Sequence, residues 1–139
     1  MRLSIGRLAL PLLVWFCMNV LYGAGVEPVL VEFFYHPGCE ECEIVKQQIL
    51  PALRKTFGDT IRLEEYDLLE KTNYFYLTQL QTRLGIHTSE PVSIYIEGAI
   101  HLGGLPAIQQ QLTNTIVQLR AGTIAEPRSS TAGPVPPPE

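Results

Sequence analysis

Runs of apolar residues separated by polar and turn-forming residues predict alternating strands and helices along most of this chain. Residues 29–35 are nearly all apolar and rich in strand formers, the pattern of a central strand covered on both faces. Residues 39–57 then show helical spacing, and the inward side of that helix is expected to carry Ile44, Val45, Ile49, Ala52 and Leu53. Pro51 lies inside this helix and predicts a kink or break near residues 47–50.

A second strand and a second helix are predicted next. Residues 60–67 place charged residues between apolar ones, as in a strand with one buried face. Residues 68–84 are a helix candidate, and Gly85 is a suitable residue to end it. Parallel pairing of the first two strands around the intervening helix requires a right-handed crossover.

A hairpin and a last helix complete the pattern. Residues 91–96 and 99–102 are strand candidates, the first opening with a proline, and Glu97-Gly98 between them signals a tight turn. Residues 105–120 are amphipathic, and their inward side is expected to carry Ile108, Leu112, Ile116 and Leu119. The predicted order is strand, helix, strand, helix, strand, strand, helix (βαβαββα), which indicates the α/β class.

Both ends of the 139-residue chain differ from this pattern. Arg2 and Arg7 begin a leader whose apolar stretch ends in small residues, so residues 1–25 are predicted to be a secretory signal peptide. The alternative is an uncleaved membrane anchor, because the apolar stretch nearly reaches the roughly 20 residues that span a bilayer. Residues 26–122 then form one domain, and the proline-rich residues 123–139 are expected to be disordered or extended.

Charge and composition exclude some classes of function. The formal net charge is −4, and removing Arg2 and Arg7 with the leader makes the remaining chain still more acidic. An acidic domain is a poor nucleic-acid binder, so no nucleic-acid partner is expected. No glycine-rich phosphate loop and no internal repeat occur in the sequence. An exported chain, periplasmic or otherwise extracytoplasmic, would meet oxidising conditions in which disulfides persist.

The sequence Cys39-Glu40-Glu41-Cys42 follows the first predicted strand directly. Cysteines three residues apart at a helix start lie on one face, and the first of them meets unpaired backbone N–H groups that favour a thiolate. So short a loop removes little entropy from the unfolded chain, which makes a purely structural disulfide the weaker interpretation. The pair therefore indicates reversible dithiol chemistry, with Cys39 as the nucleophile and Cys42 as the resolving thiol.

The Cys-x-x-Cys motif after the first strand, Pro51 in the following helix and Pro91 at the start of the hairpin together resemble the thioredoxin-like fold family. The resemblance covers residues 27–122. It implies a mixed sheet of about four strands flanked by helices, and a thiol–disulfide oxidoreductase that needs neither cofactor nor metal. The implied partners are protein thiol or disulfide substrates and a redox partner protein.

The resemblance also implies roles for residues around the cysteines. Pro91 corresponds to a cis-proline in the family, so the Glu90–Pro91 bond is expected to be cis. Glu90, Gly103 and Gly104 are expected to border a groove for an extended polypeptide substrate. Gly38 stands where relatives carry a tryptophan, which leaves the site less covered.

Three acidic residues affect the expected chemistry. Glu40 and Glu41 suit a helix start, yet their charges oppose a nearby thiolate, so the pair is expected to be comparatively reducing. The alternative is that both are only solvated residues of the helix start. Glu32 lies in the apolar first strand, where burial would raise its pKa. The resemblance implies a proton-transfer role for it at Cys42, against the alternative of a rim or salt-bridged glutamate.

The histidines give weaker indications. His36 lies three residues before Cys39 and is a candidate proton relay or hydrogen-bond donor to the thiolate, or a surface loop residue. His87 and His101 are expected to lie on the surface and not to form a metal site with the cysteines. Covalent haem attachment is excluded because Glu43, not histidine, follows Cys42.

Two other classes of function remain open from the sequence. One is a binding or metal-delivery module that uses the dithiol to hold a soft ion such as Cu(I) without turnover. The other is an accessory subunit of a membrane complex, whose proline-rich tail and groove would bind partners while the cysteines remain idle.

Overall fold

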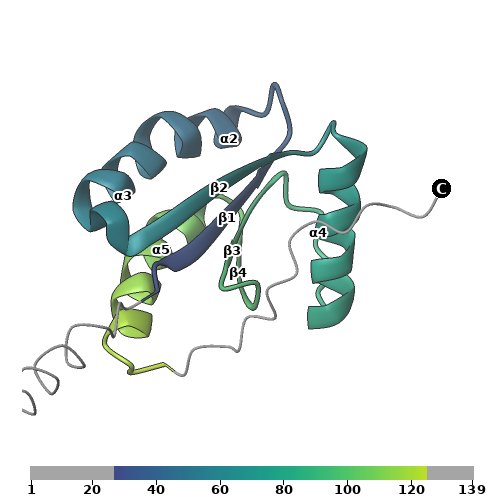
Figure 1. Ribbon diagram of the computed structural model, residues 1–139. Coiled ribbons are helices and arrows are strands. Elements are labelled where there is room, and N and C mark those ends of the chain that lie inside the picture. Colours follow the sequence, from purple (N-terminus) through teal and green to yellow (C-terminus); the bar gives the residue numbers. More distant parts are fainter. Residues whose placement is uncertain (1–26, 125–139) are drawn as a thin grey trace, which may run out of the picture.

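The computed structural model describes residues 27–124 (Figure 1). The predicted leader and nearly all of the predicted tail lie outside these residues. The domain continues past the predicted end at residue 122, because the Thr123 N–H donates to the Gln118 carbonyl at 2.9 Å and Ile124 packs against the core. Within residues 27–124, no helix is long and apolar enough to cross a membrane.

The strands form one four-stranded mixed sheet with the order β2-β1-β3-β4. β1 (Val29–Tyr35) is parallel to β2 (Ile61–Asp67) and antiparallel to β3 (Val92–Ile96), which in turn pairs antiparallel with β4 (Ile100–Gly103). β1 is therefore central, which explains why it is apolar on both faces. The predicted hairpin, the predicted parallel pair and the α/β fold with a mixed sheet of four strands flanked by helices are confirmed.

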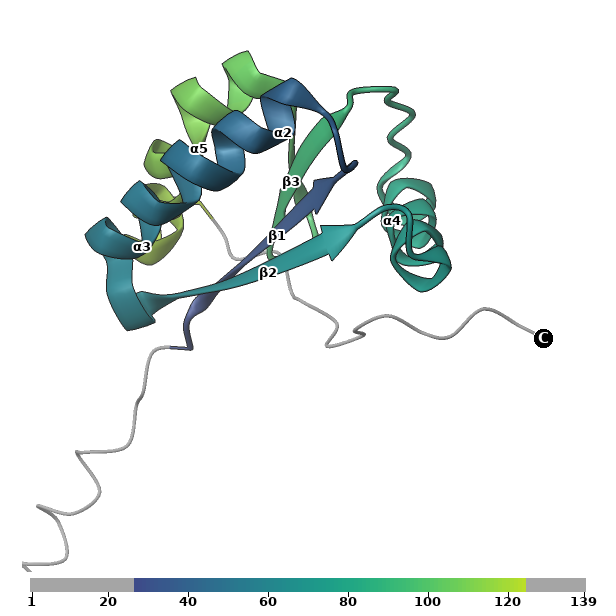
Figure 2. The ribbon, with the colours of Figure 1, turned by 90° about the horizontal axis from the view of Figure 1, so that it is seen from above.

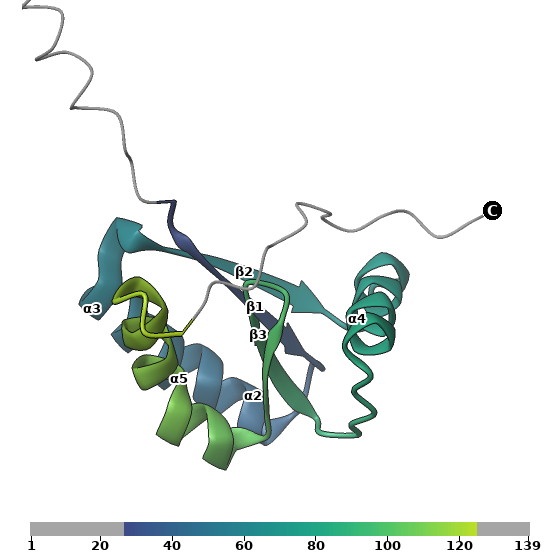
Figure 3. The same ribbon diagram turned by 90° about the horizontal axis from the view of Figure 1, so that it is seen from below.

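Helices cover both faces of the sheet (Figures 2 and 3). α2 (Glu40–Ile44), the π-helical segment η1 (Val45–Ile49) and α3 (Leu50–Phe57) follow one another and lie with α5 (Leu105–Arg120) on one face. α4 (Lys71–Leu84) covers the opposite face. The sheet is thus the middle layer of three.

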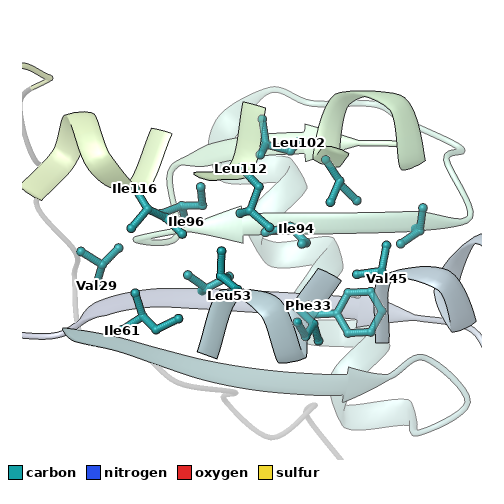
Figure 4. Packing of buried hydrophobic residues seen from close by; sticks show 14 of the residues in the cluster. Val29, Phe33, Val45, Leu53, Ile61, Ile94, Ile96, Leu102, Leu112 and Ile116 are labelled. Atoms are coloured by element: carbon teal, nitrogen blue, oxygen red, sulfur yellow. The ribbon is translucent and has the colours of Figure 1, made fainter. Parts of the chain in front are cut away.

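A hydrophobic core fills each interface between sheet and helices. The larger one lies under α2, α3 and α5, and Figure 4 shows part of it: Val29, Phe33, Val45, Leu53, Ile61, Ile94, Ile96, Leu102, Leu112 and Ile116. The smaller one lies under α4 and is mostly aromatic: Phe34, Tyr66, Tyr76, Leu77, Leu80 and Tyr95. Alternate residues of β1 enter opposite cores, as the pleat of a strand requires.

The helix after β1 is distorted where Pro51 predicted a kink, because η1 separates α2 from α3. A π-helical turn contains an extra residue and rotates the following helix about its axis. The inward stripe therefore continues with Leu50 and Leu53, which are 1% and 3% exposed. The prediction that Ala52 faces inward was wrong, since Ala52 is exposed.

α4 begins at Lys71, three residues later than the predicted start of that helix. The Asp67 side chain accepts a hydrogen bond from the Leu69 N–H at 2.8 Å, which forms a turn before the helix. Gly85 ends the helix as predicted, with a left-handed φ of 64°. The Leu68 N–H donates to the Tyr35 carbonyl at 2.9 Å, which holds this turn against the end of β1.

Candidate active site

Cys39 and Cys42 form a disulfide where β1 gives way to α2, with their Cα atoms 5.2 Å apart. Gly38 has a φ of 82°, a left-handed conformation that favours glycine, and turns the chain from the loop into the helix. Cys39 is the N-cap of α2, and its Sγ accepts a hydrogen bond from the Cys42 N–H at 3.1 Å. An N–H aimed at this sulfur would also stabilise its thiolate once the disulfide is reduced.

The two cysteines differ in their exposure to solvent. Cys42 is 2% exposed and belongs to the larger core. Cys39 is half-buried and follows the exposed loop residues His36, Pro37 and Gly38. An incoming thiol or disulfide can therefore approach Cys39 far more readily than Cys42.

Pro91 lies beside the buried sulfur, with its carbonyl oxygen 3.4 Å from Cys42 Sγ. The expectation of a cis Glu90–Pro91 bond was wrong, because every peptide bond among the described residues is trans. A trans bond is the lower-energy form even before proline. The Pro91 carbonyl oxygen thus contacts the dithiol although the Glu90–Pro91 bond is trans and not cis, as the resemblance implied.

The structure brings Glu90, Gly103 and Gly104 together. A Cβ atom at Gly103 would lie 3.2 Å from Glu90 Cγ, and one at Gly104 would lie 3.2 Å from Glu90 Oε2. Gly104 has a φ of 77° and is the N-cap of α5. The Glu90 N–H donates to Thr88 Oγ1 at 3.1 Å, so this amide is engaged within its own loop.

Glu41 reaches across to another helix, whereas Glu40 is exposed. The Leu105 N–H, in the first turn of α5, donates to Glu41 Oε2 at 3.4 Å. Sequence reasoning missed this contact because residues 41 and 105 meet only when α5 packs beside α2. Glu41 is therefore more than a solvated residue of the helix start, since the N-terminus of α5 accommodates its negative charge.

The histidines lie in different surroundings. His36 is exposed, and its Nδ1 lies 3.0 Å from the Pro37 carbonyl oxygen, within its own loop. His87 is exposed, as expected. The expectation of a surface position was wrong for His101, which is half-buried with its ring 4.8 Å from that of Tyr95. Burial lowers the pKa of His101, and the Glu90 carboxylate partly opposes this effect.

Glu32 is fully buried, and burial raises its pKa as predicted. The Tyr76 hydroxyl donates to Glu32 Oε1 at 2.5 Å and partly offsets that effect on the pKa. The implied proton transfer to Cys42 is contradicted, because Glu32 points toward α4 while Cys42 packs in the core on the opposite face of the sheet. Alternation along β1 separates the two groups.

No group of three or more histidine, cysteine, aspartate or glutamate residues suited to a metal ion occurs among residues 27–124. Within residues 27–124, the buried Glu32 Oε2 atom has no hydrogen-bond partner. The solitary acid in an apolar strand was the sequence signal for this buried polar group, but nothing in the pattern identified Tyr76 as its partner.

No family model matches the chain, and no curated protein matches its sequence. Among solved structures, the chain is similar to "Crystal Structure of Glutaredoxin 1 from Francisella tularensis Complexed with Cacodylate". The identity is 15% and the TM-score 0.42, and the match covers 64% of this chain and 98% of that chain. The strand order and pairing within residues 29–103 themselves define the α/β fold described above.

Proposed function

We propose that this chain is a thiol–disulfide oxidoreductase that acts on protein disulfides outside the cytosol through Cys39 and Cys42. The observation that carries the proposal is the asymmetry of the pair, with a half-buried Cys39 at a helix start and a Cys42 that is 2% exposed behind it. A structural disulfide has no need of an accessible sulfur, whereas thiol–disulfide exchange requires one.

The reaction follows from this asymmetry. In the reduced protein the Cys39 thiolate attacks one sulfur of a substrate disulfide, forms a mixed disulfide and expels the other substrate sulfur as a thiolate, which takes a proton from water. Cys42 loses its proton and attacks the Cys39 sulfur, which closes the internal disulfide and releases the second substrate thiolate. Two electrons pass from the dithiol to the substrate disulfide, and oxidation of a substrate dithiol is the same sequence in reverse.

Specific residues assist these steps. The Pro91 carbonyl oxygen, 3.4 Å from Cys42 Sγ, accepts a hydrogen bond from the Cys42 thiol in the reduced protein. The Cys42 N–H, 3.1 Å from Cys39 Sγ, stabilises the attacking thiolate. The negative charges of Glu40 and Glu41 oppose that thiolate, so we favour a reductase or isomerase role over that of a strong oxidant. A reductase also needs an electron donor in its compartment.

The site of action is proposed from the leader. Residues 1–25 have the basic start, apolar stretch and small-residue end of an export signal, which would place the domain in the periplasm or another extracytoplasmic space. A disulfide between Cys39 and Cys42 suits an oxidising compartment.

Insulin reduction tests the proposal. With dithiothreitol as electron donor, the domain is expected to accelerate precipitation of the insulin B chain several-fold, and Cys39→Ser is expected to remove the acceleration because it removes the attacking sulfur. Turbidity records both rates.

The same preparation separates the alternative classes. A Cu(I)-delivery module would take up one ion per reduced dithiol and leave the insulin rate unchanged. An accessory subunit would give neither turnover nor uptake. Acceleration that survives in Cys39→Ser would contradict the proposed chemistry.

A further inference from the structure

The Cys39–Cys42 disulfide specifies the chemistry of its reaction partner, a thiol or a disulfide, but leaves the charge of that partner open. Charges held in fixed positions beside a reacting sulfur favour partners of opposite charge, mainly through the rate of association. The carboxylates around the disulfide therefore bear on substrate class.

Glu41 is one carboxylate with a fixed position. It lies between the two cysteines, and its Oε2 accepts from the Leu105 N–H at 3.4 Å. That amide is in the first turn of α5, a 16-residue helix whose N-cap Gly104 makes no side-chain capping bond. The positive end of the helix stabilises the ionised form of a carboxylate placed there.

Glu90 brings a second carboxylate to the same place from another segment. It directly precedes Pro91, whose carbonyl oxygen is 3.4 Å from Cys42 Sγ. Its Oε2 lies against Gly104, only 3.2 Å from where a Cβ atom would be. The absence of side chains at Gly103 and Gly104 leaves room for this approach.

The nearby basic side chain of Lys46 interacts with residues other than Glu41 and Glu90. Lys46, one turn after Cys42, has its Nζ 3.6 Å from Glu65 Oε2 and 4.4 Å from the centre of the Tyr35 ring. Exposed Glu40 adds another negative charge beside Cys39. The disulfide is thus bordered by negative charge on the α2 and β3 sides.

We propose that Glu41 and Glu90 form an acidic rim that makes the Cys39–Cys42 site selective for cationic polypeptide thiols and disulfides over anionic ones such as glutathione. The inference depends on the proposed oxidoreductase function and specifies its substrate class. The chemistry is unchanged: a substrate thiolate attacks Cys39, a second substrate thiolate completes the reduction of the disulfide, and two electrons pass from substrate to protein.

Three synthetic peptides test the proposal: Gly-X-Cys-X-Gly with X as lysine, serine or glutamate. The rate at which each reduces the disulfide of the full protein is measured by acid quenching and mass spectrometry. At low salt the lysine peptide is expected to react on the order of tenfold faster than the glutamate peptide. The Glu41→Gln, Glu90→Gln double variant should reduce this ratio several-fold, and 1 M salt should do the same for the wild type.

The peptides differ in intrinsic thiol reactivity, but this difference contributes equally to the lysine-to-glutamate rate ratio of the wild type and of the double variant. Comparing the two ratios therefore isolates the effect of Glu41 and Glu90. Glu43→Gln is the matched control: Glu43 is exposed on the same helix, accepts from Gln47 Nε2 at 2.9 Å, and should leave the ratio as in the wild type. If the serine peptide reacts but the ratio of the lysine-peptide rate to the glutamate-peptide rate is the same in the wild type and the double variant, the acidic rim is overturned. The oxidoreductase function is then unaffected. Failure of all three peptides to react would overturn the oxidoreductase function, and the rim with it.

Discussion

Iodoacetamide is expected to modify Cys39 of the fully reduced protein at least about 100-fold faster than Cys42. Cys39 is more exposed than Cys42, and its sulfur accepts a hydrogen bond from the Cys42 N–H, which favours the reactive thiolate. Cys42 is 2% exposed, and its sulfur lies 3.4 Å from the Pro91 carbonyl oxygen, to which the thiol can donate a hydrogen bond in the reduced protein. Peptide mass spectrometry after timed quenching gives both rates.

Unfolding provides the control for this difference. In concentrated guanidinium chloride both thiols are solvated and lose their native neighbours, so the two rates should converge. Equal rates in the folded protein would contradict the assignment of Cys39 as the attacking sulfur and Cys42 as the resolving one.

Glu32→Gln is expected to increase the free energy of unfolding at alkaline pH by roughly 2 kcal/mol, because it replaces a buried charge with a neutral group of the same shape. Burial raises the folded-state pKa of Glu32 above its ordinary value of 4.5, which represents the unfolded chain. The stability that Glu32 contributes is therefore fully present below pH 4.5 and is lost as the pH rises through the higher folded-state pKa. The advantage of Glu32→Gln should accordingly vanish in acid.

Urea unfolding at a series of pH values measures this effect. Tyr76→Phe removes the hydrogen bond that lowers the pKa of Glu32, so it should reduce stability and strengthen the loss of stability with rising pH. Glu43→Gln, at an exposed position, should behave as the wild type. Identical pH profiles for wild type and Glu32→Gln would show that Glu32 is not a buried acid that titrates with folding.

The strand and helix pattern was predictable because each element has a strong local signal. β1 is apolar except for Glu32, α5 has an apolar stripe at helical spacing, and Glu97-Gly98 adopts the positive φ values, 54° and 60°, that a tight hairpin turn requires. Pro51 likewise signalled the distorted helix. The sequence could not show that the distortion is a π-helical turn, so the inward side of α3 was assigned to Ala52 instead of Leu50.

The site was predictable where its residues are neighbours in the chain and less so where packing creates it. The accessible Cys39 and the buried Cys42 follow from their places in the first helical turn. The contact of Glu41 with Leu105 depends on how α5 packs. The position of Glu32 depends on which face of β1 receives α4, and the family resemblance suggested the wrong face.

The most direct test of the central claim is trapping in the native compartment. Cys42→Ser removes the resolving thiol and should accumulate mixed disulfides through Cys39, visible as thiol-sensitive high-mass bands whose partners can be sequenced. Cys39→Ser should trap few or none. Failure of Cys42→Ser to form adducts, where a control oxidoreductase is trapped, would contradict the claim that Cys39 exchanges disulfides with protein substrates.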